Sequence, residues 1–530
     1  MASSHAAEAQ GTAGAAPQAL SEVDAEGRPN IVLFLVDDMG WQDTSVPFWK
    51  ERTPLNDTYE TPNMERLAAQ GMVFTQAYAS SISSPSRCSL LTGVNAARHR
   101  VTNWTFRRGQ MTDGADDQLV PPDWNYNGIC QTAGIPNTFV ARSFVDVLHA
   151  HGYRTIHCGK AHWGATDTPG ASPLHFGFDV NIAGHAAGGP ATYLSERNFG
   201  YDADGAPVSG FAVPDLQGYW GSGTFLTEAL TQEALRALDE AKSDADAQPF
   251  FLYMSHYAVH VPIDRDMRYF EKYRRKGLSD KEAAYASLLE GMDKSLGDIL
   301  DWLDANSEAE RTIVLFMSDN GGYATGAEWR DEPLYTQNAP LRCGKGSLLE
   351  GGIREPMIVR WPGIVQESSR CDSYLLIEDF FPSILEMAGI SRYSVPQPID
   401  GRSFVPLLCG KKSSLWRSIG ALFRGKGHSS QCRTLVWNYP HIWGNTGPGI
   451  DMNCAIRRGD WKLIYSYKTH RKELYNLRRD IGEQHNLASR HPCLVRRLSR
   501  RLGQSLRSMD AQRPSDKATG QPCPWPDEVR

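Results

Sequence analysis

Five short, largely apolar runs constrain the fold of this chain more than any other feature. They are NIVLFLV (30–36), YRTIHC (153–158), FFLYMS (250–255), TIVLFMS (312–318) and PMIVRW (356–361). Continuous runs of this length are typical of strands that are buried on both faces. Helix-like stretches separate them, at residues 62–70, 142–151, 225–243, 280–304 and 377–389. Strands that alternate with helices predict an α/β fold, in which helices sandwich a large, mostly parallel sheet.

A second pattern begins after about residue 412, where short mixed runs follow one another closely: RTLVWNY, CAIRR, WKLIYSY and ELYNL. This spacing is typical of an antiparallel meander, and a helix near residues 489–508 follows it. The sequence therefore predicts four segments: a disordered leader (1–29), an α/β domain (30–412), a smaller C-terminal α+β subdomain with an antiparallel sheet (413–508) and a tail (509–530).

The composition argues against several classes of protein. The 530 residues are 41% hydrophobic with a formal net charge of −6, as in soluble globular proteins that have a large core. We do not expect such a chain to bind nucleic acid, which requires a basic surface. No uninterrupted apolar run reaches the roughly 18 residues of a transmembrane helix. The amino terminus shows neither the basic nor the apolar region of a secretory signal, so we expect either a cytoplasmic protein or an exported one whose signal is absent from this sequence.

Acidic and amide side chains follow two of the apolar runs. Asp37 and Asp38 come directly after the first run, and Asp319 and Asn320 after the fourth. The carboxyl ends of the strands are where open α/β sheets bind ligands, so we expect these side chains to meet. Two carboxylates about 4 Å apart repel by about 4 kcal/mol at an effective dielectric constant near 20. An all-oxygen set would accept Ca²⁺ or Mg²⁺ rather than zinc, although either pair alone could simply end a strand.

Basic and imidazole side chains follow further runs. Lys160 and His162 come just after the second run, and His256 and His260 lie at or just past the third. Lys345 stands in the glycine-rich stretch RCGKGSLLEGG. Each of these residues alone is usually structural or solvated, and we predict that role for His256. Together with a metal, the others suit a phosphate-like or sulfate-like anion.

The stretch SISSPSRCSLLTG (81–93) offers several hydroxyl groups and one thiol as nucleophiles. Pro85 suits the first turn of a helix, so the residues just before it would lie at a helix amino terminus, where anions are favoured. Local chemistry alone favours Cys88, because a thiol is intrinsically the better nucleophile.

The stretch SSPSR followed by LLTG resembles the sulfatase signature: Cys or Ser, any residue, Pro, any residue, Arg, then a leucine-rich TG. This register places Ser83 at the key position, aligns Pro85 and Arg87, and leaves Cys88 as an ordinary helix residue. The resemblance extends from residue 30 to about 488 through further motifs: VDDMGW, GKAHWG, HVP, SDNGG, GKGSLLEGGIREP, AIRRGDWKLIY and ELYNLRRDIGEQHNL. The chain is identified as a member of the type I, formylglycine-dependent sulfatases of the alkaline phosphatase superfamily, with a serine-type signature.

The resemblance implies a modified residue and a metal. Ser83 would be oxidised to Cα-formylglycine (3-oxoalanine) by a radical maturation enzyme. One Ca²⁺, with Mg²⁺ as the less favoured ion, would bind to five residues: Asp37, Asp38, Asp319, Asn320 and the modified Ser83.

The resemblance also implies catalytic roles for five residues. Arg87 and Lys160 would stabilise the aldehyde hydrate and the sulfate charge. His162 would bond to the hydrate and take its proton, and His260 and Lys345 would contact the sulfate ester and assist the leaving oxygen.

Two long segments (101–141 and 165–222) and the loop VWNYPHIWGNTGPG carry aromatic, histidine and amide side chains, which favours a sulfated carbohydrate as the substrate. His185, Arg342 and His441 are the candidate substrate contacts. The alternatives are a phosphate or phosphonate ester hydrolase of the same superfamily and a non-catalytic protein that binds sulfated glycans. The family resemblance implies a periplasmic or secreted protein, and no feature of the sequence specifies an oligomeric state.

Overall fold

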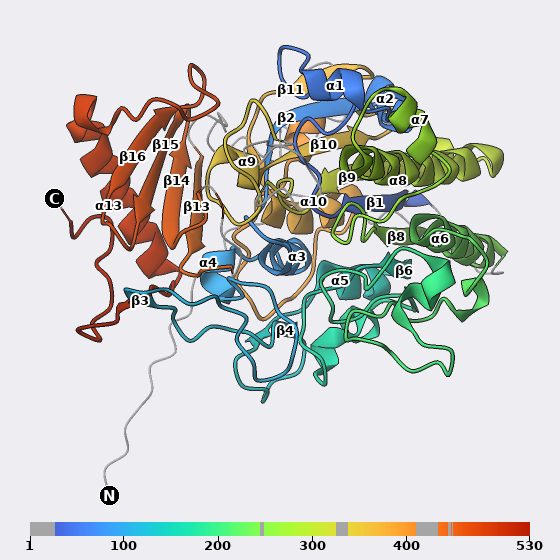
Figure 1. The fold of residues 1–530 in the computed structure, drawn as a ribbon, viewed down its shortest axis with the longest axis horizontal. Coiled ribbons are helices and arrows are strands. Elements are labelled where there is room, and N and C mark those ends of the chain that lie inside the picture. Colours follow the sequence, from blue (N-terminus) through green and yellow to red (C-terminus); the bar gives the residue numbers. More distant parts are fainter. Residues whose placement is uncertain are drawn as a thin grey trace, which may run out of the picture.

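The structure is a computed structural model that describes residues 27–243, 248–324, 338–409, 433–443, 447 and 449–529 (Figure 1). Its main sheet runs in the order β11-β2-β10-β9-β1-β8-β6-β7, with β12 also paired to β2. The strands are β1 (Asn30–Val36), β2 (Met72–Tyr78), β6 (Arg154–Gly159), β7 (Val180–Ile182), β8 (Phe250–Ser255), β9 (Thr312–Ser318), β10 (Arg354–Arg360), β11 (Ser369–Cys371) and β12 (Leu375–Leu376). All pairs are parallel except those that β10 makes with β2 and β9.

The predicted helices are confirmed with small shifts of their ends. They are α2 (Pro62–Ala69), α5 (Phe144–Ala150), α6 (Leu226–Ser243), α8 (Asp280–Ala305) and α10 (Phe380–Met387). The helix α3 (Ser83–Thr92) carries the signature stretch. Shorter helices among the described residues are α1 (Pro54–Thr58), α4 (Ala96–His99), α7 (Phe270–Arg275), α9 (Glu350–Ile353) and α11 (Val405–Leu408). No described helix combines the length and the apolar character that a bilayer-spanning helix requires.

Helices cover both faces of the main sheet. Alternate side chains of β1 point to opposite faces, as strand geometry requires. Val32, Phe34 and Val36 pack in one cluster with apolar side chains of α2, α6 and α8. On the other face, Ile31 and Leu33 pack in a second cluster with side chains of α3, α5 and α10. The predicted α/β sandwich is therefore confirmed, with both faces of β1 buried.

A separate four-stranded antiparallel sheet stands to one side of this sandwich (Figure 1). Its strands follow chain order: β13 (Thr434–Tyr439), β14 (Asn453–Arg458), β15 (Trp461–Ser466) and β16 (Lys472–Asn476). The helix α13 (Pro492–Ser508) packs on it through Leu498, Leu502 and Leu506, together with Trp525 of the tail. The predicted meander is confirmed. The predicted boundary at residue 412 and most of the leader lie outside the described residues.

Buried charges join the two sheets. Lys462 of β15 is fully buried, and its ammonium group lies 2.9 Å from Glu350 Oε1 of α9 and 3.0 Å from Glu483 Oε1. Glu350 also accepts a hydrogen bond from the hydroxyl of Tyr78 at the end of β2 (2.6 Å) and lies 3.2 Å from Arg354 Nη1. Because each charge in this group is desolvated, removing one partner leaves the others uncompensated.

We therefore expect Lys462→Met to lower the free energy of unfolding by about 3–5 kcal/mol, since it leaves two buried carboxylates without their shared cation. The control is Lys468→Met, because Lys468 pairs with Asp116 and Asp117 near the surface, where such pairs contribute about 1 kcal/mol or less. Denaturant unfolding followed by circular dichroism measures both variants. Equal stabilities would show that the buried network does not hold the two sheets together.

Candidate active site

Three buried carboxylates meet at the carboxyl edge of the main sheet. Asp37 and Asp38 follow β1, and Asp319 follows β9, whose Ser318 is paired with Val36 of β1. One side-chain oxygen from each of the three aspartates lies within 4.8 Å of the other two. Asp38 turns into this position with a positive φ of 59°.

The donor set at this edge fits a hard divalent cation. All three aspartates are at most 1% exposed, so their charges must be balanced locally. The carboxamide oxygen of Asn320, the residue after Asp319, lies 3.0 Å from the hydroxyl oxygen of Ser83 beside them. Carboxylate and amide oxygens are the ligands that Ca²⁺ and Mg²⁺ prefer, and no histidine or thiol interrupts this set.

Three basic side chains neutralise the carboxylates one to one. Arg87 Nε donates to Asp319 Oδ2 (2.8 Å), and Lys160 Nζ lies 2.6 Å from Asp37 Oδ2. Lys345 Nζ lies 2.6 Å from Asp38 Oδ1. A divalent cation added to this balanced group would make the site positive, which suits an anionic ester.

Ser83 is the first residue of α3, and its hydroxyl group faces the carboxylates. Ser83 Oγ lies 3.1 Å from Asp37 Oδ1 and accepts a hydrogen bond from Lys160 Nζ (3.1 Å). The N-cap position is held by Ile82, so no side chain caps this helix end. Uncapped N–H groups and the helix dipole favour an anion there.

Arg87 lies four residues after Ser83, and so on the same face of α3. Its Nη1 donates to Ser255 Oγ (2.6 Å) and to the carbonyl of Lys160 (3.1 Å). Its Nη2 is buried 4.0 Å from Asp37 Oδ1 and makes no hydrogen bond with the described residues. One guanidinium donor thus remains available inside the site.

Cys88 lies on another face of the same helix. Its thiol is fully buried and contacts the carbonyl of Trp163 (3.7 Å). Burial raises the pKa of this thiol well above its usual value, which suppresses the reactive thiolate. Cys88 is therefore a core residue, as the register of the signature predicts.

Two histidines lie close to the charged groups of the site, His260 beside Asp38 and His162 near Lys160 and Arg87. His162 Nε2 lies 3.0 Å from the carbonyl of Thr105, and its Nδ1 is buried without a partner among the described residues. His260 Nδ1 lies 2.7 Å from the carbonyl of Val261, and its Nε2 lies 3.7 Å from Asp38 Oδ2.

Burial and the surrounding cations shift the pKa values of these groups. Burial, helped by the charges of Lys160 and Arg87, holds the pKa of His162 well below its usual value. Burial and the charge of Lys345 also lower the pKa of His260. Both imidazoles are therefore neutral at neutral pH and can accept a proton. Burial lowers the pKa of Lys160 to about 8, although the Asp37 carboxylate opposes this shift.

His256 points away from the carboxylates. Its Nε2 hydrogen-bonds to Ser295 Oγ of α8 (2.8 Å), and its ring packs on Phe34 at a centroid distance of 5.1 Å. This position fits the structural role that we predict for His256.

The three candidate substrate contacts occupy different environments. His185 lies beside the site, because its carbonyl accepts a hydrogen bond from the backbone N–H of His162 (3.2 Å). Arg342 Nη1 instead donates to the carbonyl of Glu483 (3.0 Å). His441 is fully buried, and its ring nitrogens lie 2.6 Å from Thr102 Oγ1 and 2.6 Å from Asp113 Oδ1. The structure thus places the backbone of His185 beside His162 and holds Arg342 and His441 in contacts with the protein.

Three contacts of the site are missing from the sequence-based prediction. Ser255, at the end of β8, binds Arg87, and the carbonyl of Thr105 binds His162. The ring of Trp443, on the loop after β13, lies with its centroid 5.1 Å from Lys345 Nζ. Ser255 ends a predicted strand, which is a usable signal, whereas the other two contacts depend on how long loops fold.

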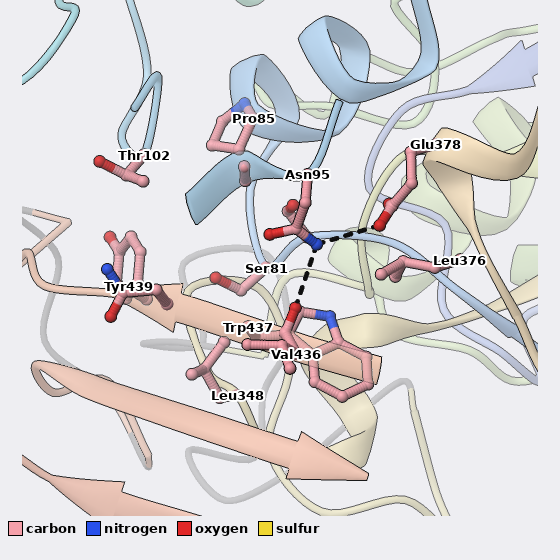
Figure 2. A pocket seen from close by; sticks show the side chains of 13 residues that line it. Ser81, Pro85, Asn95, Thr102, Leu348, Leu376, Glu378, Val436, Trp437 and Tyr439 are labelled. Atoms are coloured by element: carbon pink, nitrogen blue, oxygen red, sulfur yellow. Dashed lines mark hydrogen bonds between the residues drawn. The ribbon is translucent and has the colours of Figure 1, made fainter. Parts of the chain in front are cut away.

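A small cavity of about 20 Å³ lies behind the first turn of α3 (Figure 2). Its lining includes Ser81 just before α3, Pro85 in the first turn of α3, and Trp437 and Tyr439 of β13. The amide group of Asn95 donates to Glu378 Oε1 (3.0 Å) and to the carbonyl of Val436 (3.2 Å), as the dashed lines in Figure 2 show. The cavity has room for about one water molecule, so it is not a substrate pocket. It marks where the C-terminal sheet supports the helix that carries Ser83.

Comparison with family models matches nearly the whole chain. The model described as Sulfatase matches residues 29–390, and the model described as N-sulphoglucosamine sulphohydrolase, C-terminal, matches residues 344–512.

Individual proteins give the same result. A protein of Formosa agariphila named Sulfatase is 29% identical, over 88% of this chain and 86% of its own length. Human N-acetylgalactosamine-6-sulfatase is 30% identical, over 87% of this chain and 81% of its own length. The crystal structure of Ps i-CgsB in complex with k-i-k-neocarrahexaose has the same fold, with a TM-score of 0.67 and 23% identity, over 90% of this chain and 93% of that chain. This chain therefore belongs to the sulfatase family and is a sulfuric ester hydrolase.

Proposed function

We propose that the protein hydrolyses O-sulfate monoesters of carbohydrates, with a formylglycine made from Ser83 as the nucleophile and a bound Ca²⁺. The observation that carries this proposal is the position of the Ser83 hydroxyl. It lies at an uncapped helix amino terminus, 3.1 Å from Asp37 Oδ1, 3.0 Å from Asn320 Oδ1 and 3.1 Å from Lys160 Nζ.

The metal and the modified residue would supply chemistry that the unmodified chain lacks. We propose that Asp37, Asp38, Asp319, Asn320 and the modified Ser83 hold Ca²⁺, which would supply positive charge and Lewis acidity at the Ser83 position. A hydrated aldehyde would supply one hydroxyl group for attack and a second for the release of sulfate, which a serine side chain does not have. Because Ser83 is only 2% exposed, the radical maturation enzyme that we propose as a partner must act before folding is complete.

The surrounding side chains would bind the sulfate group and move protons. Arg87 has an unused guanidinium donor in the site, and Lys160 and Lys345 place ammonium groups against the carboxylates. These cations would stabilise the sulfate oxygens. Neutral His162 would accept the proton of the nucleophile, and His260 would serve the leaving oxygen; such acid–base help typically contributes about 10²–10⁴-fold to the rate.

Two findings support a sugar as the alcohol part of the ester. A relative that is 30% identical, human N-acetylgalactosamine-6-sulfatase, carries a sugar sulfate in its name. An aromatic ring also stands close to the site, because the centroid of Trp443 lies 5.1 Å from Lys345 Nζ, and Trp104 and Phe106 are the sequence neighbours of Thr105, whose carbonyl lies 3.0 Å from His162 Nε2. Aromatic faces at a polar site suit the apolar face of a sugar ring.

Ser83→Ala should lower sulfate release from sulfated sugars by at least about 10³-fold, because it removes the nucleophile. Cys88→Ala is the matched control, since it changes a core thiol one residue beyond Arg87, and most activity should remain. Sulfate release from both variants, made in a host with the maturation system, measures the effect. The converse pattern, in which only the Cys88 variant is inactive, would contradict the assignment of Ser83.

The peptide that contains Ser83 gives a test that is independent of turnover. In protein from a host with the maturation system, its mass should be about two units lower than the sequence predicts, as expected for an aldehyde before hydration. An unmodified peptide from such protein would exclude the serine-type mechanism.

Ca²⁺ should raise the melting temperature of protein that has been freed of divalent cations, because it binds only the folded site. At 100 times the dissociation constant, the expected stabilisation is about 2.7 kcal/mol. Asp37→Asn should abolish this response, whereas Asp266→Asn, which changes a buried aspartate paired with Arg268, should keep it. Differential scanning calorimetry measures the shift. An undiminished response in the Asp37 variant would place the Ca²⁺ site elsewhere.

A further inference from the structure

A hollow of about 530 Å³ is lined by residues of the segment 190–211. Its lining residues include Pro190, Thr192, Arg197, Tyr201, Ser209 and Phe211, and we call it the 190–211 hollow. Its volume falls within the range of small-ligand sites, roughly 300–1,000 Å³. None of these residues has a role in the proposed chemistry at Ser83.

One wall of the hollow begins at a catalytic histidine. Gly189, directly before Pro190, packs so closely on the ring of His260 that a Cβ added to it would lie 2.6 Å from His260 Nδ1. Adjacent Cα atoms are about 3.8 Å apart, so the hollow starts one residue from this contact.

Another lining residue, Phe211, is linked through Phe106 to the segment that contacts the other histidine. Phe211 stacks on Phe106 with ring centroids 4.7 Å apart. Phe106 follows Thr105, whose carbonyl lies 3.0 Å from His162 Nε2. The hollow is therefore bounded on two sides by segments that contact the two histidines of the site.

The lining chemistry fits a sugar that carries a negative charge. Tyr201 and Phe211 offer aromatic faces, and the Tyr201 ring is held by stacking on Trp220 at a centroid distance of 5.3 Å. Ser209 offers a hydroxyl group. The side chain of Arg197 is exposed and makes no hydrogen bond or ion pair with the other described residues. A free guanidinium group binds sulfate or carboxylate oxygens in a bidentate manner.

We propose that the 190–211 hollow is a subsite for an anionic sugar unit adjacent to the one that carries the scissile sulfate. This inference rests on the proposed function, in which His260 faces the leaving oxygen and the rest of the saccharide extends from that side. The chain past Gly189 leads from His260 into the hollow. Arg197 binds the sulfate or carboxylate group of the second sugar, and Tyr201 and Phe211 pack on its ring.

The test measures binding in the Ser83→Ala background, which removes turnover. The probes are a disaccharide sulfated on both rings and the corresponding monosulfated monosaccharide, with affinities measured by isothermal titration calorimetry. The disaccharide should bind more tightly than the monosaccharide. Arg197→Ala should reduce the ratio of the disaccharide affinity to the monosaccharide affinity by about 10- to 100-fold, as expected when a charged hydrogen bond is lost. Arg197→Lys should restore part of it, because a lysine keeps the charge but not the bidentate geometry.

The matched control is Arg500→Ala. Arg500 is also exposed and free of ion pairs with the described residues, but it lies on α13, which packs on the C-terminal sheet. This variant should keep the full advantage. The subsite proposal would be overturned by either of two results. One is that the disaccharide binds no more tightly than the monosaccharide in the Ser83→Ala background. The other is that Arg197→Ala leaves the ratio of the two affinities unchanged. Sulfate release by the matured protein with Ser83 unmutated is measured separately, and failure to release sulfate from either probe counts against the proposed function instead.

Discussion

The buried carboxylates of Asp37, Asp38 and Asp319 are the constraint on which the rest of the site depends. Each pair of bare carboxylates about 4 Å apart would repel by about 4 kcal/mol at an effective dielectric constant near 20. In the structure each carboxylate is paired with one cationic side chain: Asp37 with Lys160, Asp38 with Lys345 and Asp319 with Arg87. Lys160 directly follows β6, Lys345 lies in the loop before α9, and Arg87 lies in α3, so the charge balance fixes how three distant segments meet.

The C-terminal sheet contributes none of these charges, yet it supports two of the segments that carry them. Lys462 and Glu483 bind Glu350 in the helix that directly follows the loop of Lys345. Trp443 packs against Lys345 itself, and the residues of β13 close the small cavity behind the first turn of α3. The second sheet is therefore part of the structure that holds the site together.

Much of the site follows from the sequence, because strand ends are visible in it. Runs such as NIVLFLV and TIVLFMS predict both the strands and the edge at which Asp37 and Asp319 meet. The strand β2 is missed, since Thr75 and Gln76 interrupt its apolar character, and the antiparallel direction of β10 leaves no signal in the sequence. Ser83 and Arg87 are four residues apart and share a helix face, whereas the thiol of Cys88 is buried in the core, so the side chains that the register selects are the ones that lie beside the carboxylates.

Loop residues are harder to predict, because their neighbours are set by tertiary contacts. The sequence favours Arg342 and His441 as substrate contacts on residue type alone. In the structure Arg342 binds a carbonyl of the C-terminal unit, and His441 is buried between Thr102 and Asp113. Conversely, the contact of Trp443 with Lys345 joins residues almost a hundred positions apart, and no local pattern predicts it.

The same cluster of buried carboxylates and cations, with a metal bound to it, would also stabilise a phosphate or phosphonate ester, so the choice between sulfur and phosphorus is the central claim. The direct measurement compares kcat/KM for sulfate release from a panel of O-sulfated sugars with kcat/KM for phosphate release from sugars phosphorylated at the same hydroxyl groups, using protein matured at Ser83. This account predicts that at least one sulfate ester is cleaved about 100-fold more efficiently than its phosphate counterpart. A phosphate ester that is cleaved more efficiently than every sulfate ester of the panel would contradict it.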